Sequence, residues 1–182
     1  MRTDIILLAS GSSRRFQGNK LLYRMDGLPL IEHTLQKLSA LKPHELIVVT
    51  KYSEIEELAK GYGAAVIYNA YACEGQSASI RQGIARSTGN QAMLCVGDQP
   101  YLKPATLRRM LELSDQEHII CVSCNGIVRN PAIFPRKYYQ ELLQLKNEQG
   151  GKLIMKKYPD EIISVECDPD EVRDIDERTD IV

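Results

Sequence analysis

The chain has 182 residues, and we expect residues 1–182 to form one domain that buries a substantial core. Its 43% hydrophobic and 26% charged residues are ordinary for a soluble globular protein, and the formal net charge of −1 argues against general binding to nucleic acid or to a membrane surface. Because there is no N-terminal signal pattern and no apolar stretch of about 18 residues, we expect a cytoplasmic protein.

The first predicted element is a strand that leads into a loop of small and cationic residues. Residues 5–9 are an uninterrupted apolar run, typical of a buried strand. Small residues let backbone N–H groups approach an anion, and cations neutralise its charge. The loop therefore predicts a polyphosphate site, with an ordinary basic turn as the alternative; it is neither a Walker A loop nor a dinucleotide fingerprint. Its small residues and cations are Gly11, Ser12, Ser13, Arg14, Arg15, Lys20 and Arg24.

Helical and strand patterns then alternate, which is typical of a mostly parallel, doubly wound sheet. Pro29 opens the first helix, and Ser53 with Glu56 predicts a capping box at the start of the second. The last helix of this series starts at Pro104 or Thr106. Between these helices we expect strands at residues 46–49, 65–68 and 92–96, and a further helix after the loop at 69–76.

The pattern changes in the second half of the chain. Residues 119–124 and 127–134 read as two strands joined by a type I′ turn, and Pro131 indicates a bulge or an edge strand. Helices near residues 137–146 and 151–157 follow, then a strand at 162–165 and a short acidic tail. We expect an α/β fold with a mostly parallel central sheet, a β-hairpin and a mixed edge in the second half.

A candidate metal ligand follows one of the parallel strands. In an open parallel sheet, ligands bind beyond the carboxyl ends of the strands, where the strand order reverses. Residues 92–96 lead into Asp98, a lone carboxylate of the kind that Mg²⁺ combines with phosphate oxygens and water. The alternative is a turn-forming Asp ahead of Pro100.

A second carboxylate is expected from the C-terminal tail. In an extended segment Asp174 and Asp176 share a face, with Ile175 buried on the opposite one. The alternative is a solvated acidic segment.

Together these pieces resemble the signature of the MobA/MocA group of molybdenum-cofactor nucleotidyltransferases, roughly L-A-[AG]-G-x-S-x-R-M-G-x-x-K. The segment that carries the resemblance is Leu8-Ala9-Ser10-Gly11-x-Ser13-x-Arg15-Phe16-x-Gly18-x-Lys20. The resemblance continues through Leu22 with Gly27-x-Pro29-Leu30, Glu74-Gly75-x-Ser77-x-Ser79-Ile80, Gly97-Asp98-Gln99-Pro100, Asn130-Pro131-Ala132-Ile133-Phe134 and Asp174-Ile175-Asp176. The Gly-Asp-Gln-Pro and Asn-Pro-x-x-Phe elements look more like the cytidylyltransferase (MocA-like) branch than the guanylyltransferase branch.

The resemblance implies a Rossmann-like, GT-A-like three-layer fold. It also implies transfer of CMP from CTP to the molybdopterin form of the molybdenum cofactor, with Mg²⁺ as cofactor and release of pyrophosphate. By position, Lys20, Arg15 and Asp98 would be catalytic, and Asp98 with Asp176 would hold the metal. The residues that would bind the nucleotide are Leu8, Ala9, Ser10, Gly11, Ser13, Arg15, Lys20, Gly75, Ser77 and Ser79. Ser10 stands where the family has a smaller Ala or Gly beside the base.

The expected chemistry requires no general base. An acceptor phosphate monoester has a second pKa of about 6, so it is a dianion at neutral pH. The remaining work is positioning, in-line alignment and charge neutralisation, which suits Lys20, Arg15 and Mg²⁺ on Asp98.

Two alternatives stay open. One is a transferase of the same fold that uses a sugar phosphate or another small acceptor. The other is a non-catalytic module that delivers the cofactor to a molybdenum hydroxylase client. Lys20 and Asp98 argue against the second, since a pure binder has little need of a metal carboxylate.

Overall fold

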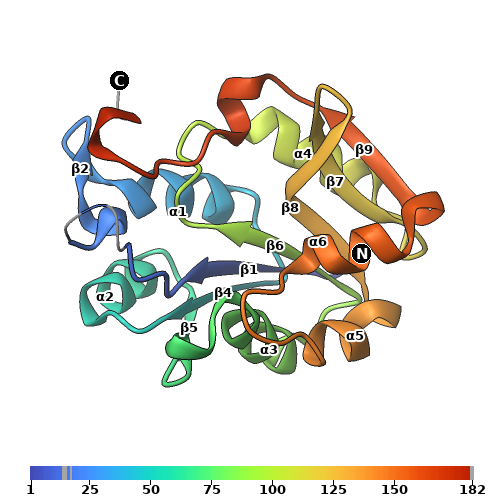
Figure 1. The fold of residues 1–182 in the computed structure, drawn as a ribbon, viewed down its shortest axis with the longest axis horizontal. Coiled ribbons are helices and arrows are strands. Elements are labelled where there is room, and N and C mark those ends of the chain that lie inside the picture. The colour runs from blue at the N-terminus through green and yellow to red at the C-terminus, as the bar shows by residue number, and fades with distance from the viewer. Residues whose placement is uncertain (14–15, 17, 181–182) are drawn as a thin grey trace.

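The computed structural model describes residues 1–13, 16 and 18–180, and in this part of the chain seven strands form one sheet with helices on both faces (Figure 1). The strand order is β5-β4-β1-β6-β8-β7-β9. The strands are β1 (Thr3–Ala9), β4 (Glu45–Thr50), β5 (Ala65–Tyr68), β6 (Gln91–Val96), β7 (Ile119–Cys124), β8 (Ile127–Pro135) and β9 (Ile162–Glu166). The α-helices are α1 (Leu30–Ala40), α2 (Ser53–Gly61), α3 (Gln76–Arg86), α4 (Pro104–Leu113), α5 (Tyr139–Leu143) and α6 (Gly151–Lys157). A separate two-stranded hairpin joins β2 (Arg24–Met25) to β3 (Leu28–Pro29).

The sheet is mostly parallel, as predicted, and its only antiparallel member among the described strands is β8. Strand β1 pairs in parallel with β4 and β6, whereas β8 runs antiparallel to both β6 and β7. The edge position considered for Pro131 is wrong, because β8 lies inside the sheet between β6 and β7. The bulge is confirmed: Cys121 pairs with Ala132 and Val122 pairs with Arg129, so residues 130–131 fall outside the register. A bulge accommodates Pro131 because proline has no N–H to donate to a ladder.

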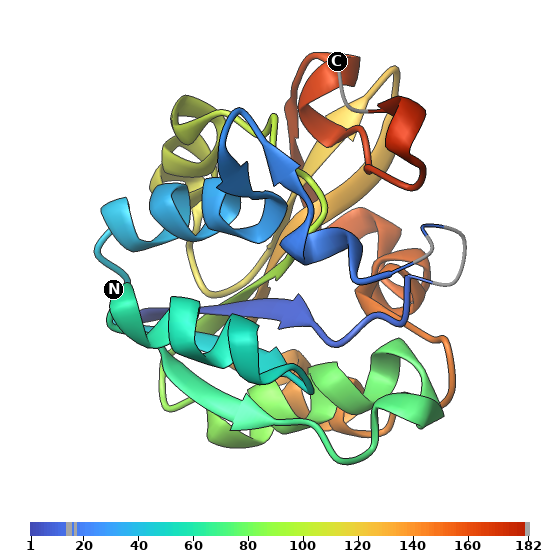
Figure 2. The ribbon, with the colours of Figure 1, turned by 90° about the vertical axis from the view of Figure 1, so that its left-hand side faces the viewer.

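The core is divided between the two faces of the sheet. Successive side chains of a strand point to opposite faces. Accordingly, Ile5 and Leu7 of β1 pack with the face that carries α1 and α4, whereas Ile6 packs with the face that carries α3, α5 and α6. Figure 2 shows α1 and α3 on opposite sides of β1. Helix α3 approaches closely because Gly83 has no side chain: a Cβ atom there would lie 2.4 Å from Ile6 Cγ2.

Two local predictions differ from the structure. The capping box at Ser53 and Glu56 is wrong, because α2 already begins at Ser53, its N-cap is Tyr52, and no side chain caps it. The backbone bond from Glu56 N to the Tyr52 carbonyl starts the helix one residue earlier than the box requires. The helix expected at residues 137–146 is shorter, since a 3-10 turn over Arg136–Tyr138 precedes α5.

The helices of the described chain include none that is long and apolar enough to cross a membrane.

The topology places the loop after β1 beside the loop after β6, at the carboxyl ends of these two strands. Strand order reverses at β1, whose neighbours are β4 on one side and β6 on the other. Leu8 is paired with Val96, and Gly97 N donates to the Leu8 carbonyl at 3.2 Å. The loops that follow Ala9 and Val96 therefore leave the sheet side by side, as the rule for ligand sites in open parallel sheets predicts.

Candidate functional site

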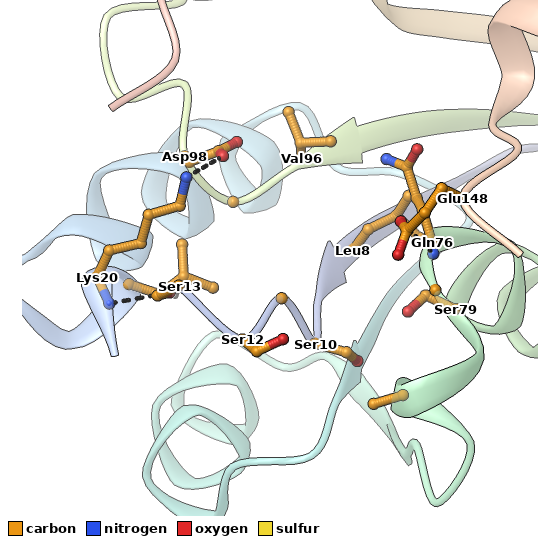
Figure 3. A pocket seen from close by; sticks show the side chains of 15 residues that line it. Leu8, Ser10, Ser12, Ser13, Lys20, Gln76, Ser79, Val96, Asp98 and Glu148 are labelled. Carbon is orange, nitrogen blue, oxygen red and sulfur yellow. Dashed lines mark hydrogen bonds and ion pairs between the residues drawn. The ribbon is translucent and has the colours of Figure 1, made fainter. Parts of the chain in front are cut away.

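A pocket of about 290 Å³ opens beyond the carboxyl ends of β1 and β6 (Figure 3). Its walls come from the loop after β1, from Lys20, from the start of α3 and from the turn after β6. Seven of the predicted nucleotide-binding residues line it: Leu8, Ser10, Gly11, Ser13, Lys20, Gly75 and Ser79. Because it gathers residues predicted to bind a nucleotide, we refer to this cavity as the nucleotide pocket.

Two other predicted residues, Ala9 and Ser77, lie outside the pocket lining. Ala9 is buried, and its carbonyl accepts a hydrogen bond from Thr50 Oγ1 at 3.0 Å. Ser77 is fully buried, and its hydroxyl accepts a bond from Arg81 at 3.0 Å. Ala9 and Ser77 therefore support β1 and α3 behind the pocket wall. Arg15 lies outside the described residues.

Lys20 links two carboxylates at one side of the pocket. Its Nζ lies 2.7 Å from Asp98 Oδ2 and 3.1 Å from Asp176 Oδ1. Burial of the ammonium acts to lower the pKa of Lys20, but the charges and hydrogen bonds of Asp98 and Asp176 outweigh it and raise this pKa. Lys20 is therefore a fixed positive charge at neutral pH.

The backbone near Lys20 is held by the loop that precedes it. Lys20 begins a short 3-10 turn whose N-cap, Asn19, accepts a hydrogen bond from Leu21 N at 3.1 Å. Lys20 N donates to Ser13 Oγ at 3.2 Å (Figure 3). Ser13 thus positions the lysine backbone and also faces the nucleotide pocket.

The C-terminal tail closes the site against the turn after β6. Ile175 is fully buried, and its N–H donates to the Asp98 carbonyl at 3.0 Å. Burial and the nearby charges of Asp98 and Asp176 raise the pKa of Asp174, although a hydrogen bond from Gln99 opposes this. The burial of Ile175 is as expected, but the two flanking carboxylates take different partners: Asp174 accepts from Gln99, and Asp176 faces Lys20.

The chemistry of the carboxylates suits a magnesium ion held jointly with a substrate. Asp98 and Asp176 converge on one point, because both lie within hydrogen-bonding distance of the same Lys20 Nζ. The described residues contain no group of three or more His, Cys, Asp or Glu side chains that could hold a metal. Two carboxylates fit Mg²⁺ when phosphate oxygens and water supply its other ligands.

A buried hydrogen-bond network supports the far wall of the nucleotide pocket. The Asn69 side chain donates from Nδ2 to Ser10 Oγ at 3.1 Å and to Ser79 Oγ at 2.9 Å. Ser10 Oγ in turn donates to the Val49 carbonyl, and Asn69 Oδ1 accepts from Gln82 Nε2 at 2.6 Å. Asn69 thereby joins the ends of β1 and β5 to α3. The sequence prediction missed this residue; the signal was a polar amide directly after a predicted strand.

The start of α3 is fixed by a glycine that no other residue could replace without movement. Gly75 has φ +94°, and a Cβ atom there would lie 2.6 Å from the Asn147 backbone. Ser77 N donates to the Asn147 carbonyl at 3.1 Å, and Gln76 N donates to Glu148 Oε2 at 3.3 Å. The loop before α6 is thus anchored to the rim of the nucleotide pocket.

Residues 5–162 match the family described as the MobA-like NTP transferase domain, and the chain belongs to this family. A probable molybdenum cofactor guanylyltransferase from Thermococcus sibiricus is 29% identical over 155 residues, which cover 83% of this chain and 77% of that protein. A 3-deoxy-manno-octulosonate cytidylyltransferase from Elusimicrobium minutum is 24% identical over 136 residues, and the match spans 71% of this chain and about half, 55%, of that protein.

Solved structures share the fold across nearly the whole chain. A nucleotidyl transferase from Methanothermobacter superposes with a TM-score of 0.86 at 25% identity, covering 98% of this chain and 94% of the other. Rv0371c from Mycobacterium tuberculosis, 24% identical, has the same TM-score and covers 99% and 95% of the two chains. The α/β fold is that of nucleotidyltransferases, and the chain is a nucleotidyltransferase of the MobA-like family.

Proposed function

We propose that this protein transfers CMP from CTP to the terminal phosphate of the molybdopterin form of the molybdenum cofactor, in a magnesium-dependent reaction that releases pyrophosphate. The observation that carries the proposal is the convergence of Asp98 and Asp176 on Lys20 Nζ, at the edge of a pocket formed by a glycine and serine loop.

The residues of the nucleotide pocket have different roles in the transfer. The loop containing Gly11 and Ser13 cradles the triphosphate with backbone N–H groups and a hydroxyl. Asp98 and Asp176 would hold Mg²⁺, which when bound neutralises charge on the phosphates. Lys20, and by family position Arg15, supply further positive charge where the transition state accumulates negative charge.

The reaction is an in-line displacement at the α-phosphorus. An oxygen of the acceptor phosphate forms a bond to the α-phosphorus, and the bond from that phosphorus to the bridging oxygen of the β-phosphate breaks. Pyrophosphate leaves with the electron pair. The second pKa of the acceptor phosphate is about 6, so the phosphate is a dianion at neutral pH and no proton has to be removed first.

Lys20 has a different partner in each state under this proposal. Without nucleotide its single positive charge lies between Asp98 and Asp176 and offsets the repulsion between the two carboxylates. With Asp98 and Asp176 engaged as ligands of Mg²⁺, the Lys20 ammonium would be free to contact a phosphate. While Lys20 faces these two carboxylates, its raised pKa keeps the ammonium charged at neutral pH.

Two nucleotides, CTP and GTP, are candidates for the donor. CTP is favoured by the Gly97-Asp98-Gln99-Pro100 and Asn130-Pro131-Ala132-Ile133-Phe134 elements and by the cytidylyltransferase relative. GTP is favoured by the names of two other relatives, probable molybdenum cofactor guanylyltransferases from Thermococcus sibiricus and Pyrococcus horikoshii. A client enzyme of the molybdenum hydroxylase class would then receive the dinucleotide cofactor.

Pyrophosphate release tests the proposal directly. The purified protein is given each of the four NTPs, with and without molybdenum cofactor, in Mg²⁺ and in EDTA. We expect release with CTP only when both the cofactor and Mg²⁺ are present. Release with sugar phosphates but not with molybdenum cofactor would contradict the acceptor, and no release with any NTP and acceptor would favour the delivery module instead.

A further inference from the structure

A second pocket adjoins the nucleotide pocket on the other side of Asp98. It encloses about 270 Å³ and shares Gln76, Val96 and Asp98 with the nucleotide pocket. Its remaining walls come from β8, from α6, from Gln99 in the turn after β6 and from the tail residue Asp174. Asp98, a predicted metal ligand, therefore stands at the junction of two cavities.

Two cations that have no partner among the described residues line this second pocket. Arg129 comes from β8 and Lys152 from α6, and both residues are exposed. Within residues 1–13, 16 and 18–180, neither side chain has a hydrogen bond or an ion pair. Lys157, at the other end of the same short helix, is instead paired with Glu141 at 2.6 Å. Arg129 and Lys152 are thus available to an anionic ligand.

The bulge in β8 and the packing of α6 create the space. Pairing of β8 with β6 ends at Ala132 and Leu94, so β8 beyond the bulge and the end of β6 are no longer joined by a ladder. Helix α6 packs tightly on β8 through Gly151, where a Cβ atom would lie 2.7 Å from Phe134 Cζ. This contact brings Lys152 to the same cavity as Arg129.

The polar part of the remaining lining suits a hydrogen-bonding molecule, beside the apolar side chains of Val96, Val128 and Met155. The amides of Gln99 and Asn130 face the pocket together with the carboxylates of Asp98 and Asp174. Gln99 Nε2 already donates to Asp174 at 2.9 Å, which fixes the orientation of that amide. A divalent cation on Asp98 would leave the pocket with an excess of positive charge.

We infer that this second pocket binds the phosphate monoester of the acceptor, and that Arg129 and Lys152 hold its dianion. The inference rests on the proposed function, which requires such an acceptor. Donor and acceptor then approach Asp98 from two sides, the arrangement that an in-line displacement at the α-phosphorus requires. Arg129 and Lys152 act by binding the acceptor and take no part in the bond changes.

Phenyl phosphate is a suitable probe because it is a simple phosphate monoester. It is titrated into the protein and followed by ³¹P NMR, with Mg²⁺ and saturating α,β-methylene analogues of CTP and GTP in parallel runs to occupy the nucleotide pocket. We expect saturable binding to the wild type, weakened about tenfold in each of Arg129→Ala and Lys152→Ala, because each loses a charge-assisted hydrogen bond.

Matched controls come from exposed cations outside the pocket. Lys156→Ala changes the same helix α6, and Arg108→Ala changes the exposed face of α4; both should bind phenyl phosphate as the wild type does. Equal binding by Arg129→Ala, Lys152→Ala and the controls, or no saturable binding to the wild type, would overturn the inference.

The transfer reaction separates this inference from the proposed function. With molybdenum cofactor as acceptor, Arg129→Ala and Lys152→Ala should raise the KM of the acceptor about tenfold and leave the KM of the nucleotide unchanged. One outcome is that no NTP is turned over with that cofactor while phenyl phosphate binding still depends on Arg129 and Lys152. The proposed acceptor is then wrong, and the assignment of the second pocket to a phosphate monoester is supported. If turnover occurs with both KM values unaltered in the variants, the pocket assignment is wrong and the proposed function stands.

Discussion

Lys20 and Asp176 are separated by 156 positions in the chain, yet Lys20 Nζ lies 3.1 Å from Asp176 Oδ1. The same ammonium contacts Asp98 at 2.7 Å, so one cation joins the loop after β1, the turn after β6 and the C-terminal tail. The candidate site is thus assembled from three distant segments and depends on all of them.

Asp98→Ala should leave the protein folded and remove nearly all transfer activity, because the proposed Mg²⁺ would lose its ligand at the junction of the two pockets. Pyrophosphate release measures the activity, and circular dichroism checks the fold. Asp170→Ala, an exposed carboxylate of the same tail, is the matched control and should behave as the wild type. A folded Asp98→Ala protein with near wild-type turnover would remove Asp98 from the metal site.

Lys20→Ala should weaken nucleotide binding and slow turnover together. Loss of a charge that acts on the transition state costs about 2–4 kcal/mol, or roughly 10²- to 10³-fold in kcat/KM. Lys60→Ala, which removes a surface ion pair on α2, should have little effect. Equally small losses in both variants would show that the ion pairs of Lys20 with Asp98 and Asp176 are structural and that Lys20 does not contact the nucleotide.

Arg14→Ala should lose much less activity than Lys20→Ala, because the family pattern places the phosphate contact at Arg15 and adjacent residues on a regular backbone point in different directions. Steady-state kinetics of Arg14→Ala and Arg15→Ala measure this difference. A larger loss in Arg14→Ala than in Arg15→Ala would reverse the assignment of the phosphate contact.

Asn69→Ala should raise the KM of the nucleotide about tenfold, because it removes the amide that ties Ser10 to Ser79 across the wall of the nucleotide pocket. The KM of the acceptor should not change, since the network lies on the nucleotide side. Asn90→Ala removes an amide near Arg2, at the other end of β1, and serves as the control. A uniform loss of kcat with both KM values intact would contradict this positioning role.

Asp4 should make stability depend on pH in the acid range. Its carboxylate is fully buried, and burial alone would raise its pKa. Hydrogen bonds from His44 at 2.7 Å, Ser87 at 2.7 Å and Gly89 N at 2.8 Å outweigh burial and lower this pKa below 3.8. Because the folded pKa is lowered, the stabilisation is present above about pH 4 and is lost as the pH falls through the folded pKa.

Asp4→Asn tests this dependence by urea unfolding. At pH 7 the variant should lose about 1–3 kcal/mol in the free energy of unfolding, since an amide nitrogen cannot accept the bonds that the carboxylate oxygen accepts. The difference from the wild type should shrink below pH 4. Asp160→Asn, an exposed carboxylate, should show no such dependence. A difference that stays constant down to pH 2.5 would assign the effect to packing.

Local sequence patterns were sufficient to predict the order of helices and strands and the meeting of the loop after β1 with Asp98. Apolar runs of four to six residues and the alternation of elements are properties of neighbouring residues. In an open parallel sheet, the loops that bind ligands lie beyond the carboxyl ends of such strands, so their meeting could be predicted. Pro131 indicated a bulge or an edge strand, because proline cannot donate to a ladder, and the structure has the bulge, at residues 130–131.

The position of the tail depends on contacts that no local pattern reveals. Glu171 is buried and accepts hydrogen bonds from Thr106 Oγ1 at 2.6 Å and from Lys103 N at 3.1 Å. This anchor directs the chain so that Ile175 reaches the Asp98 carbonyl and Asp176 reaches Lys20. An acidic residue far from its partners in sequence looks like a solvated charge until the fold brings them together.

A competition between CTP and GTP tests the central claim most directly. The two nucleotides are supplied at equal concentration with Mg²⁺ and molybdenum cofactor, and the dinucleotide product is identified by mass. The proposed function predicts a predominantly cytidine product, because a site whose polar groups pair with one base leaves them unpaired with the other. A predominantly guanine product would contradict the cytidylyl assignment, and the absence of any dinucleotide product would contradict transfer to this cofactor.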